Sequence, residues 1–244
     1  MLLLAGCVQP GLAPGIEAAT RRVLDALGIE CCVPPAAGCC GAIRQHLDDA
    51  RGALEEARRN IDAWWPLVEA GAEALVVNAS GCGVMVREYG HLLRDDPAYA
   101  ARATRIAALA CDLAELVQRE LPQLAALAVR TAVPARIAFH PPCTLQHGLR
   151  IVGVVEAILA ALGAQLRPFP DAGQCCGSAG TYSLLQAPLA ERLRQAKIAA
   201  LEHSGADLVL SANVGCIEHL AGAARLPVRH WIEWVDERIA GGRA

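Results

Sequence analysis

Cysteine is the residue type whose spacing in this sequence most clearly indicates chemistry. The chain contains 11 cysteines, and an adjacent pair precedes glycine twice, as Cys39-Cys40-Gly41 and Cys175-Cys176-Gly177. A single cysteine precedes each pair by 32 residues, and another follows at a similar distance. The eight cysteines of this pattern are Cys7, Cys39, Cys40, Cys82, Cys143, Cys175, Cys176 and Cys216. Because thiolates bind zinc and iron–sulfur clusters, the pattern predicts two four-cysteine metal sites.

The two cysteine sets form an internal repeat. Corresponding cysteines are offset by 136 residues at three positions and by 134 at the fourth. A repeat of this length predicts two similar lobes, each large enough for a core of its own. We expect a first cysteine-rich domain at residues 1–130 and a second at residues 131–244.

Composition narrows the class of protein. Apolar residues make up 54% of the chain and charged residues 19%, which is typical of a globular protein. The net charge of −3 and the lack of a basic stripe argue against nucleic acid as a partner. No apolar run reaches membrane-spanning length. Eleven cysteines without a secretory signal indicate metal or redox chemistry in the cytoplasm, with disulfides as the alternative.

The segment Leu4-Ala5-Gly6-Cys7 resembles a bacterial lipoprotein cleavage site. Only six residues precede Cys7, and none of them is basic, whereas a signal peptide needs a charged region and a longer apolar stretch. Cys7 also has a counterpart far along the chain, Cys143. We therefore predict that Cys7 is a metal ligand and not a lipid anchor.

Short apolar runs alternate with amphipathic segments along both halves of the chain. We expect strands at 2–5, 29–33, 75–77, 136–140, 165–167, 208–210 and 227–229. We expect helices at 16–27, 48–69, 84–93, 98–108, 111–120, 152–162, around 189–200, and at 231–239. This order predicts an α/β fold with two pseudo-symmetric lobes, each a small, largely parallel sheet flanked by helices. Ligands of such sheets gather beyond the carboxyl ends of the strands, where Cys7, Cys82, Cys143 and Cys216 are expected.

The adjacent cysteines favour an iron–sulfur cluster over zinc. Structural zinc sites typically use Cys-x-x-Cys knuckles, and Met85 and His219 stand where a second cysteine would complete them. Neighbouring side chains diverge, which suits a polynuclear cluster better than one tetrahedral ion. The glycines beside each pair allow backbone N–H groups to approach the sulfurs. Zinc or a thiol site remains the alternative, and inert buried cysteine is the least favoured one.

Other residues near the pattern have open roles. His140 and His147 flank Cys143 and are either neighbours of a cluster or ordinary polar histidines, and His219 is a further candidate ligand. Asn78 and Asn213 precede the last cysteine of each half, which favours a shared turn-forming role. The cysteines without repeat partners are predicted to be buried and inert: Cys31, Cys32 and Cys111.

The motifs around the cysteines also carry a resemblance that extends over essentially the whole chain. Examples are Ala79-Ser80-Gly81-Cys82-Gly83, Pro142-Cys143-Thr144-Leu145-Gln146-His147-Gly148 and Cys175-Cys176-Gly177-Ser178-Ala179-Gly180-Thr181-Tyr182. They resemble the tandem cysteine-rich CCG domain of heterodisulfide reductases and lactate-utilisation iron–sulfur proteins. The likeness is greatest to the C-terminal part of glycolate oxidase iron–sulfur subunits.

The resemblance implies an electron-transfer subunit with no catalytic residue of its own. The eight patterned cysteines would hold one or two iron–sulfur clusters of the 4Fe–4S type. A flavin-containing dehydrogenase subunit, which carries the FAD, would oxidise glycolate, and electrons would pass towards quinone. No flavin or nucleotide fingerprint occurs in this sequence, so hydride chemistry is expected in that partner. The implied location is cytoplasmic, with peripheral attachment to the inner face of the membrane through partners.

The sequence departs from the resembling proteins in two ways. It lacks the ferredoxin-like Cys-x-x-Cys-x-x-Cys runs of the full subunits, so we expect a ferredoxin-like module elsewhere as a partner. It also lacks the fifth cysteine that heterodisulfide reductases have in each repeat, where Met85 and His219 stand. The second departure weakens the alternative of a thiol–disulfide oxidoreductase. A zinc-stabilised assembly module is the non-enzymatic alternative.

Overall fold

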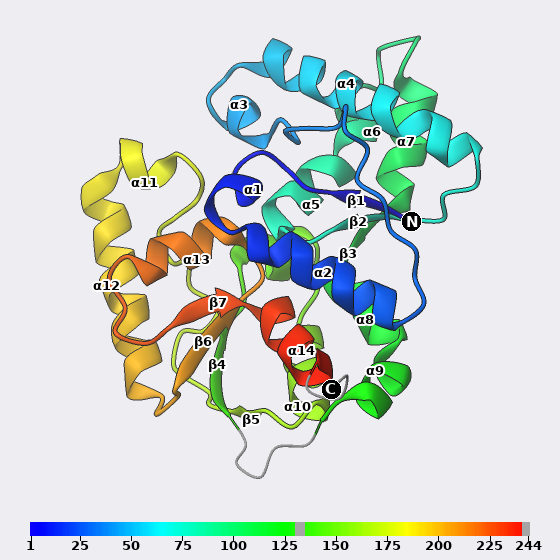
Figure 1. The fold of residues 1–244 in the computed structure, drawn as a ribbon. Helices are drawn as coiled ribbons and strands as arrows, with labels where there is room; N and C mark the ends of the chain where they lie inside the picture. Colours follow the sequence, from blue (N-terminus) through cyan, green and yellow to red (C-terminus); the bar gives the residue numbers. More distant parts are fainter. Residues whose placement is uncertain (130–134, 241–244) are drawn as a thin grey trace.

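The computed structural model describes residues 1–129 and 135–240 and has two parallel β-sheets (Figure 1). The first sheet has the order β1-β2-β3, and the second has the order β5-β4-β6-β7. The strands are β1 (Leu2–Leu4), β2 (Leu75–Val77), β3 (Ala110–Asp112), β4 (Arg136–His140), β5 (Gln165–Leu166), β6 (Leu208–Ser211) and β7 (Val228–His230). All pairings are parallel, so the predicted α/β class with two parallel sheets is confirmed.

Helices connect the strands and cover the sheets. Those of the first half are α1 (Gln9–Leu12), α2 (Pro14–Ala26), α3 (Ala42–His46), α4 (Ala50–Glu69), α5 (Ser80–Arg87), α6 (Tyr89–Leu92), α7 (Ala100–Leu109), α8 (Leu113–Arg119) and α9 (Leu121–Leu127). Those of the second half are the π-helix η1 (Thr144–Gly148), α10 (Val154–Ala161), α11 (Tyr182–Leu185), α12 (Ala187–His203), α13 (Val214–Ala221) and α14 (Trp231–Ala240). Every residue of β1 and β2 is buried, as expected for parallel strands covered on both faces.

Two elements of the first half differ from the sequence-based prediction. The expected strand at 29–33 is reduced to a single bridge between Leu2 and Cys32, because Pro34 and Pro35 follow at once. The expected helix at 111–120 begins only at Leu113, because residues 110–112 extend the sheet as β3. Asp112 then caps the helix, accepting a hydrogen bond from the backbone N–H of Ala114 at 2.9 Å.

The same helix cap occurs at the end of each sheet. The backbone N–H of Asp112 donates to Glu115 at 2.9 Å, and that of His230 donates to Glu233 at 3.0 Å. His230 Nδ1 accepts from the N–H of Ile232 at 3.2 Å, which is the role of the Asp112 carboxylate in α8. The repeat therefore extends beyond the cysteines to α8 and α14.

Helices of each lobe pack on helices of the other lobe. Helix α14 packs on α2, the first long helix of the other lobe, and α8 packs on α10 (Figure 1). One continuous core contains Leu3 and Val76 of the first lobe together with Phe139 and Leu210 of the second. The proposed domain boundary between residues 130 and 131 lies outside the described residues.

The cap of α8 generates a prediction about stability and pH. Burial raises the pKa of Asp112 to about 7, so the folded state retains its proton between the unfolded pKa near 4 and neutrality. The stability contributed by this proton is present at pH 4 and is lost as pH rises through 7. Asp112→Asn keeps the cap and removes the titration, so we expect the variant to gain on the order of 2–4 kcal/mol relative to wild type between pH 5 and 8.

Chemical unfolding of both proteins at several pH values measures this difference. Parallel stability curves for wild type and Asp112→Asn would show that the buried carboxyl does not contribute to the pH dependence.

Candidate metal centre

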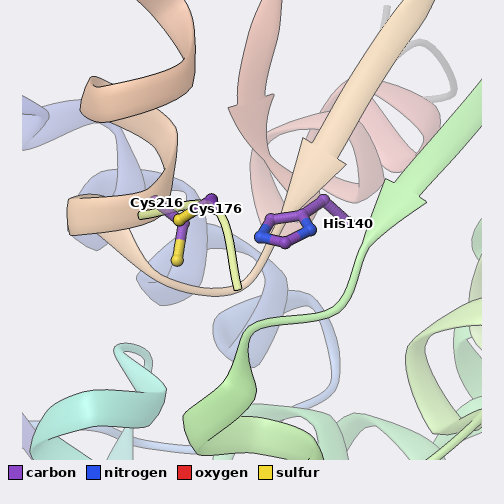
Figure 2. A group of neighbouring side chains, drawn as sticks. All are labelled: His140, Cys176 and Cys216. Atoms are coloured by element: carbon purple, nitrogen blue, oxygen red, sulfur yellow. The ribbon is translucent and has the colours of Figure 1, made fainter. Parts of the chain in front are cut away.

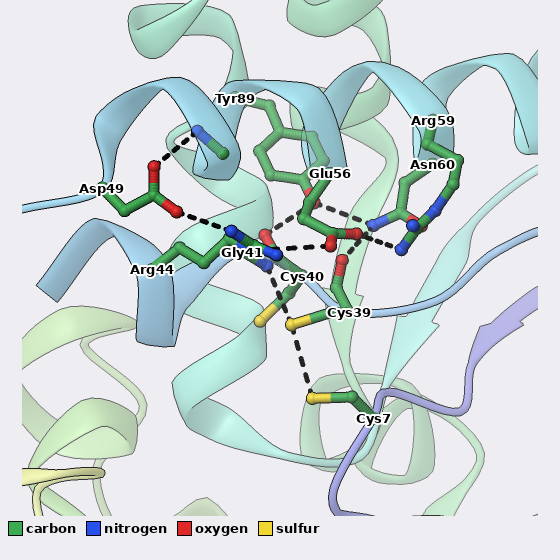
Figure 3. A network of polar contacts seen from close by, with 11 residues as sticks. Cys7, Cys39, Cys40, Gly41, Arg44, Asp49, Glu56, Arg59, Asn60 and Tyr89 are labelled. Atoms are coloured by element: carbon green, nitrogen blue, oxygen red, sulfur yellow. Dashed lines mark hydrogen bonds and ion pairs between the residues drawn. The ribbon is translucent and has the colours of Figure 1, made fainter. Parts of the chain in front are cut away.

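Three of the four patterned cysteines of the first lobe, Cys7, Cys39 and Cys40, lie together in Figure 3, and Cys82 lies beside Cys40. Cys7 follows β1, Cys39 and Cys40 form the turn before α3, and Cys82 lies in the first turn of α5. The Sγ atoms of Cys7 and Cys39 are 3.3 Å apart, and those of Cys40 and Cys82 are also 3.3 Å apart. Residues up to 75 positions apart in sequence thus place four thiols at one end of the sheet.

The Cys-Cys-Gly turn is held by helix α4. Gly41 has φ +89°, and a Cβ built on it would lie 3.0 Å from the carbonyl oxygen of Ala53. The side chain of Asn60 accepts from the N–H of Gly38 at 2.8 Å and donates to the carbonyl of Cys39 at 2.7 Å. These bonds leave the N–H of Gly41 free to donate to Cys39 Sγ at 3.4 Å.

The second lobe repeats this arrangement with different supporting residues. The N–H of Gly177 donates to Cys175 Sγ at 3.3 Å, as Gly41 does to Cys39. Cys176, Cys216 and His140 have potential ligand atoms that all lie within 4.8 Å of one another (Figure 2). Cys143 stands at the start of η1, and the neighbouring Cys175 raises the pKa of its thiol.

Each lobe stabilises a thiolate. Hydrogen bonds from Cys40 and Cys7 lower the pKa of Cys39 to about 2, and those from Cys143 and Cys176 lower the pKa of Cys175 to about 2. The thiols that donate these bonds have raised pKa values: Cys7, Cys40, Cys143 and Cys176. The thiolate is the form of cysteine that binds metals.

All eight patterned cysteines line one cavity between the lobes, with a volume of about 1420 Å³. Its remaining wall is mainly apolar, and large apolar side chains at its edge are exposed: Val8, Leu12, Ile43, Leu184, Leu185 and Leu189. At its base the lobes are joined by a bond of 2.7 Å between the hydroxyls of Ser80 and Thr144 and one of 3.3 Å from the N–H of Gly81 to Asn213. The two sites therefore line the same open cavity.

The unpatterned cysteines lie outside this cavity, and one of them differs from the prediction. Cys111 is buried in β3, as expected, and Cys31 is partly buried. Cys32 is exposed, so its prediction as a buried residue is wrong, because the segment that carries it makes only one bridge to β1.

The residues that flank the cysteines have separate roles. Met85 lines the cavity, whereas His219 does not. The amide of Asn213 donates to Cys216 Sγ at 3.8 Å, whereas that of Asn78 donates to Thr20 at 3.0 Å inside the first lobe. The predicted shared role of these two asparagines is therefore wrong.

Sequence reasoning missed the residues that hold the turns. Asn60 and Tyr89 bind the turn in the first lobe, and Lys197 Nζ donates to the carbonyls of Asp171 and Ala172 just before the turn in the second. The available signal was a polar residue on the buried face of a long amphipathic helix, which Asn60 and Lys197 both provide.

The donor sets fit a thiolate-bound metal centre. Four thiols converge in each lobe, and soft sulfur donors select zinc or iron–sulfur clusters. Backbone N–H groups aimed at Cys39 and Cys175 supply the hydrogen bonds that stabilise such centres.

Two copies of a parallel α/β unit, each with a Cys-Cys-Gly turn and two further cysteines, define a tandem cysteine-rich domain. The family "CCG: Cysteine-rich domain" matches residues 1–87 and 137–221, and the chain belongs to this family. The resemblance drawn from the sequence motifs is confirmed.

Curated relatives are similar to this chain over most of its length. The chain is 49% identical over 239 residues to the glycolate oxidase iron-sulfur subunit of Escherichia coli, covering 98% of this chain and 58% of that protein. It is 32% identical over 218 residues to lactate utilization protein A of Geobacillus kaustophilus, covering 86% of this chain and 87% of that protein. The chain thus spans little more than half of the E. coli relative. Among the described residues, none of the helices combines the length and the apolar character needed to cross a membrane.

The close approach of Gly177 to α12 can be tested by substitution. An alanine Cβ there would overlap the carbonyl oxygen of Ala190, at φ +94°. We expect Gly177→Ala to cost roughly 3 kcal/mol or more of unfolding free energy, from the left-handed backbone and the overlap. Gly163→Ala is the control, because Gly163 has φ +89° with nothing within 4 Å, so only the backbone cost of about 1–2 kcal/mol remains.

Denaturant unfolding of both variants measures the difference. Equal losses for Gly177→Ala and Gly163→Ala would contradict the close contact between the turn and the helix.

Proposed function

We propose that this chain is an iron–sulfur electron-transfer subunit of a complex that oxidises glycolate. The observation that carries the proposal is the pair of four-cysteine sites on one cavity. The identity to a glycolate oxidase iron-sulfur subunit supports the reaction. The proposed ligands are Cys7, Cys39, Cys40 and Cys82 in the first lobe, and Cys143, Cys175, Cys176 and Cys216 in the second.

An iron–sulfur cluster held by four such thiolates supplies one-electron storage at each site. The chain contributes ligand placement, N–H donors from Gly41 and Gly177, and an apolar wall that limits water. Since both proposed ligand sets line one cavity, the two redox sites would face that cavity together.

The proposed complex needs further subunits. A flavin-containing dehydrogenase subunit with FAD would take the hydride from glycolate, and a ferredoxin-like module and quinone would carry electrons onward. The chain would work in the cytoplasm, at the inner face of the membrane through these partners.

A zinc-stabilised docking module is a second candidate. The group formed by His140, Cys176 and Cys216 resembles the mixed Cys and His sets that zinc uses. Metal analysis after anaerobic reconstitution separates the two candidates, because iron with inorganic sulfide supports a brown cluster protein and zinc alone supports the colourless module.

The ligand assignment predicts which cysteines hold iron. Changing Cys39, Cys40 or Cys82 to Ser should remove the iron of the first lobe, roughly half of the total, and leave the second lobe loaded. Cys111→Ser is the matched control, because Cys111 is buried but lies outside the cavity. Iron and sulfide analysis measures the outcome, and equal loss in Cys111→Ser and Cys40→Ser would show that the wrong cysteines are assigned.

The relay proposal also predicts inactivity of the chain alone. Without a flavin subunit, the reconstituted chain should oxidise no glycolate in a dye-coupled assay, because its sequence carries no flavin or nucleotide fingerprint for hydride transfer. A Cys40→Ser, Cys176→Ser double variant provides the background rate. Turnover well above that background would contradict the electron-transfer role and show that the chain itself catalyses glycolate oxidation.

A further inference from the structure

The two metal sites are built alike but differ at two supporting positions. Gly41 and Gly177 approach the carbonyls of Ala53 and Ala190, which fixes the alignment of α4 with α12. Asn60 and Lys197 each follow that alanine by seven residues and are therefore equivalent.

The second difference lies in the strands. Leu4 and His140 each stand three residues before the first cysteine of their lobe, at the ends of β1 and β4. One difference replaces the neutral amide of Asn60 with the ammonium group of Lys197, and the other replaces the apolar side chain of Leu4 with the imidazole of His140.

Lys197 places a cation behind the second turn. Its side chain is 1% exposed, and Nζ donates to the carbonyls of Asp171 and Ala172, the latter at 3.1 Å. Burial lowers the pKa of Lys197, and the nearby Cys176, Asp171, Cys143 and Cys175 oppose that shift electrostatically. In the first lobe the neutral amide of Asn60 performs the same tethering without a charge.

His140 places an unused donor in front of the second site. The residue is 0% exposed, and neither ring nitrogen finds a hydrogen-bond partner among the described residues. Its ring edge faces Cys176 and Cys216, whose sulfurs lie within 4.8 Å of it (Figure 2). A buried imidazole without a partner is costly, and sulfur of a bound cluster offers the missing acceptor.

Cations also occur near the first site, but they are placed differently. Arg44 and Arg59 act on Cys39, yet their side chains are about half exposed and pair with Asp49 and Glu56 (Figure 3). Solvent and these carboxylates screen their charge. Cys216 is more deeply buried than Cys82. Burial disfavours added negative charge, so this difference alone would lower the reduction potential of the second site relative to the first.

We propose that His140 and Lys197 raise the reduction potential of the second site above that of the first, so that electrons collect in the second lobe. Reduction adds a negative charge, which a buried cation and an N–H donor to sulfur stabilise. This inference rests on the proposed function, since it requires a cluster at each site. His140 acts as a hydrogen-bond donor and Lys197 through its charge, and neither is proposed as a cluster ligand.

Potentiometric titration with dithionite, followed by electron paramagnetic resonance, tests the proposal. Cys176→Ser isolates the first site and Cys40→Ser the second. At the same solution potential, the second site should be more reduced than the first. In the Cys40→Ser background, His140→Leu and Lys197→Asn should each lower the ratio of reduced to oxidised second site by about tenfold. These substitutions install the residues of the first lobe. Lys197→Arg keeps the positive charge, so the reduction potential of the second site should stay near that of the wild-type residue.

The controls separate the outcomes. In the Cys176→Ser background, Arg59→Gln should change the reduction potential of the first site much less. In the same background, Asn60→Lys should raise that potential, and this test remains if Lys197→Asn fails to fold. Unchanged potentials in the His140 and Lys197 variants, or a lower potential at the second site, would overturn the proposal. Loss of iron in His140→Leu would also overturn it, by making His140 a ligand. Absence of any cluster in the wild-type chain would instead refute the proposed function.

Discussion

The close approach of each Cys-Cys-Gly turn to a long helix is the constraint on which both sites depend. The turn must bring adjacent cysteines to the ends of strands that belong to distant parts of the chain. Positive φ at Gly41 and Gly177 lets the backbone turn against α4 and α12, where a larger residue would collide with a helix carbonyl. With the turn held there, the single cysteines that follow β1 and β4 and those in α5 and α13 lie near the pair.

Both sites also depend on how the lobes are joined. The common core crosses the lobe interface, and the Ser80–Thr144 and Gly81–Asn213 hydrogen bonds lie at the base of the cavity. A cavity that contains all eight cysteines therefore has walls from two sheets packed into one structure, and its width is set by ordinary core packing. Rigid packing of this kind fixes the separation of the sites.

Much of this architecture could be predicted from the sequence, because the repeat and the buried apolar strands are strong local signals. The cysteine spacing predicted two equivalent sets, and the structure brings both sets to one cavity. Strand β3 was missed because its three residues follow an Ala-rich helix and contain Asp112, which disfavours a strand until it is recognised as a helix cap. The shared cavity and the exposed segment at Cys32 depend on tertiary packing, which no local pattern contains.

The reciprocal packing of helices between the lobes bears on how the two-lobed chain arose. Contacts of α2 with α14 and of α10 with α8 are reciprocal, which is the pattern of an isologous dimer of identical subunits. A homodimer must keep its two sites identical, because one gene encodes both. Joining two copies in one chain removes that restriction, so a leucine in one copy and a histidine in the other can coexist around the same cavity. Covalent fusion thus allows the two sites of a symmetric scaffold to differ, which gives electron transfer between them a preferred direction.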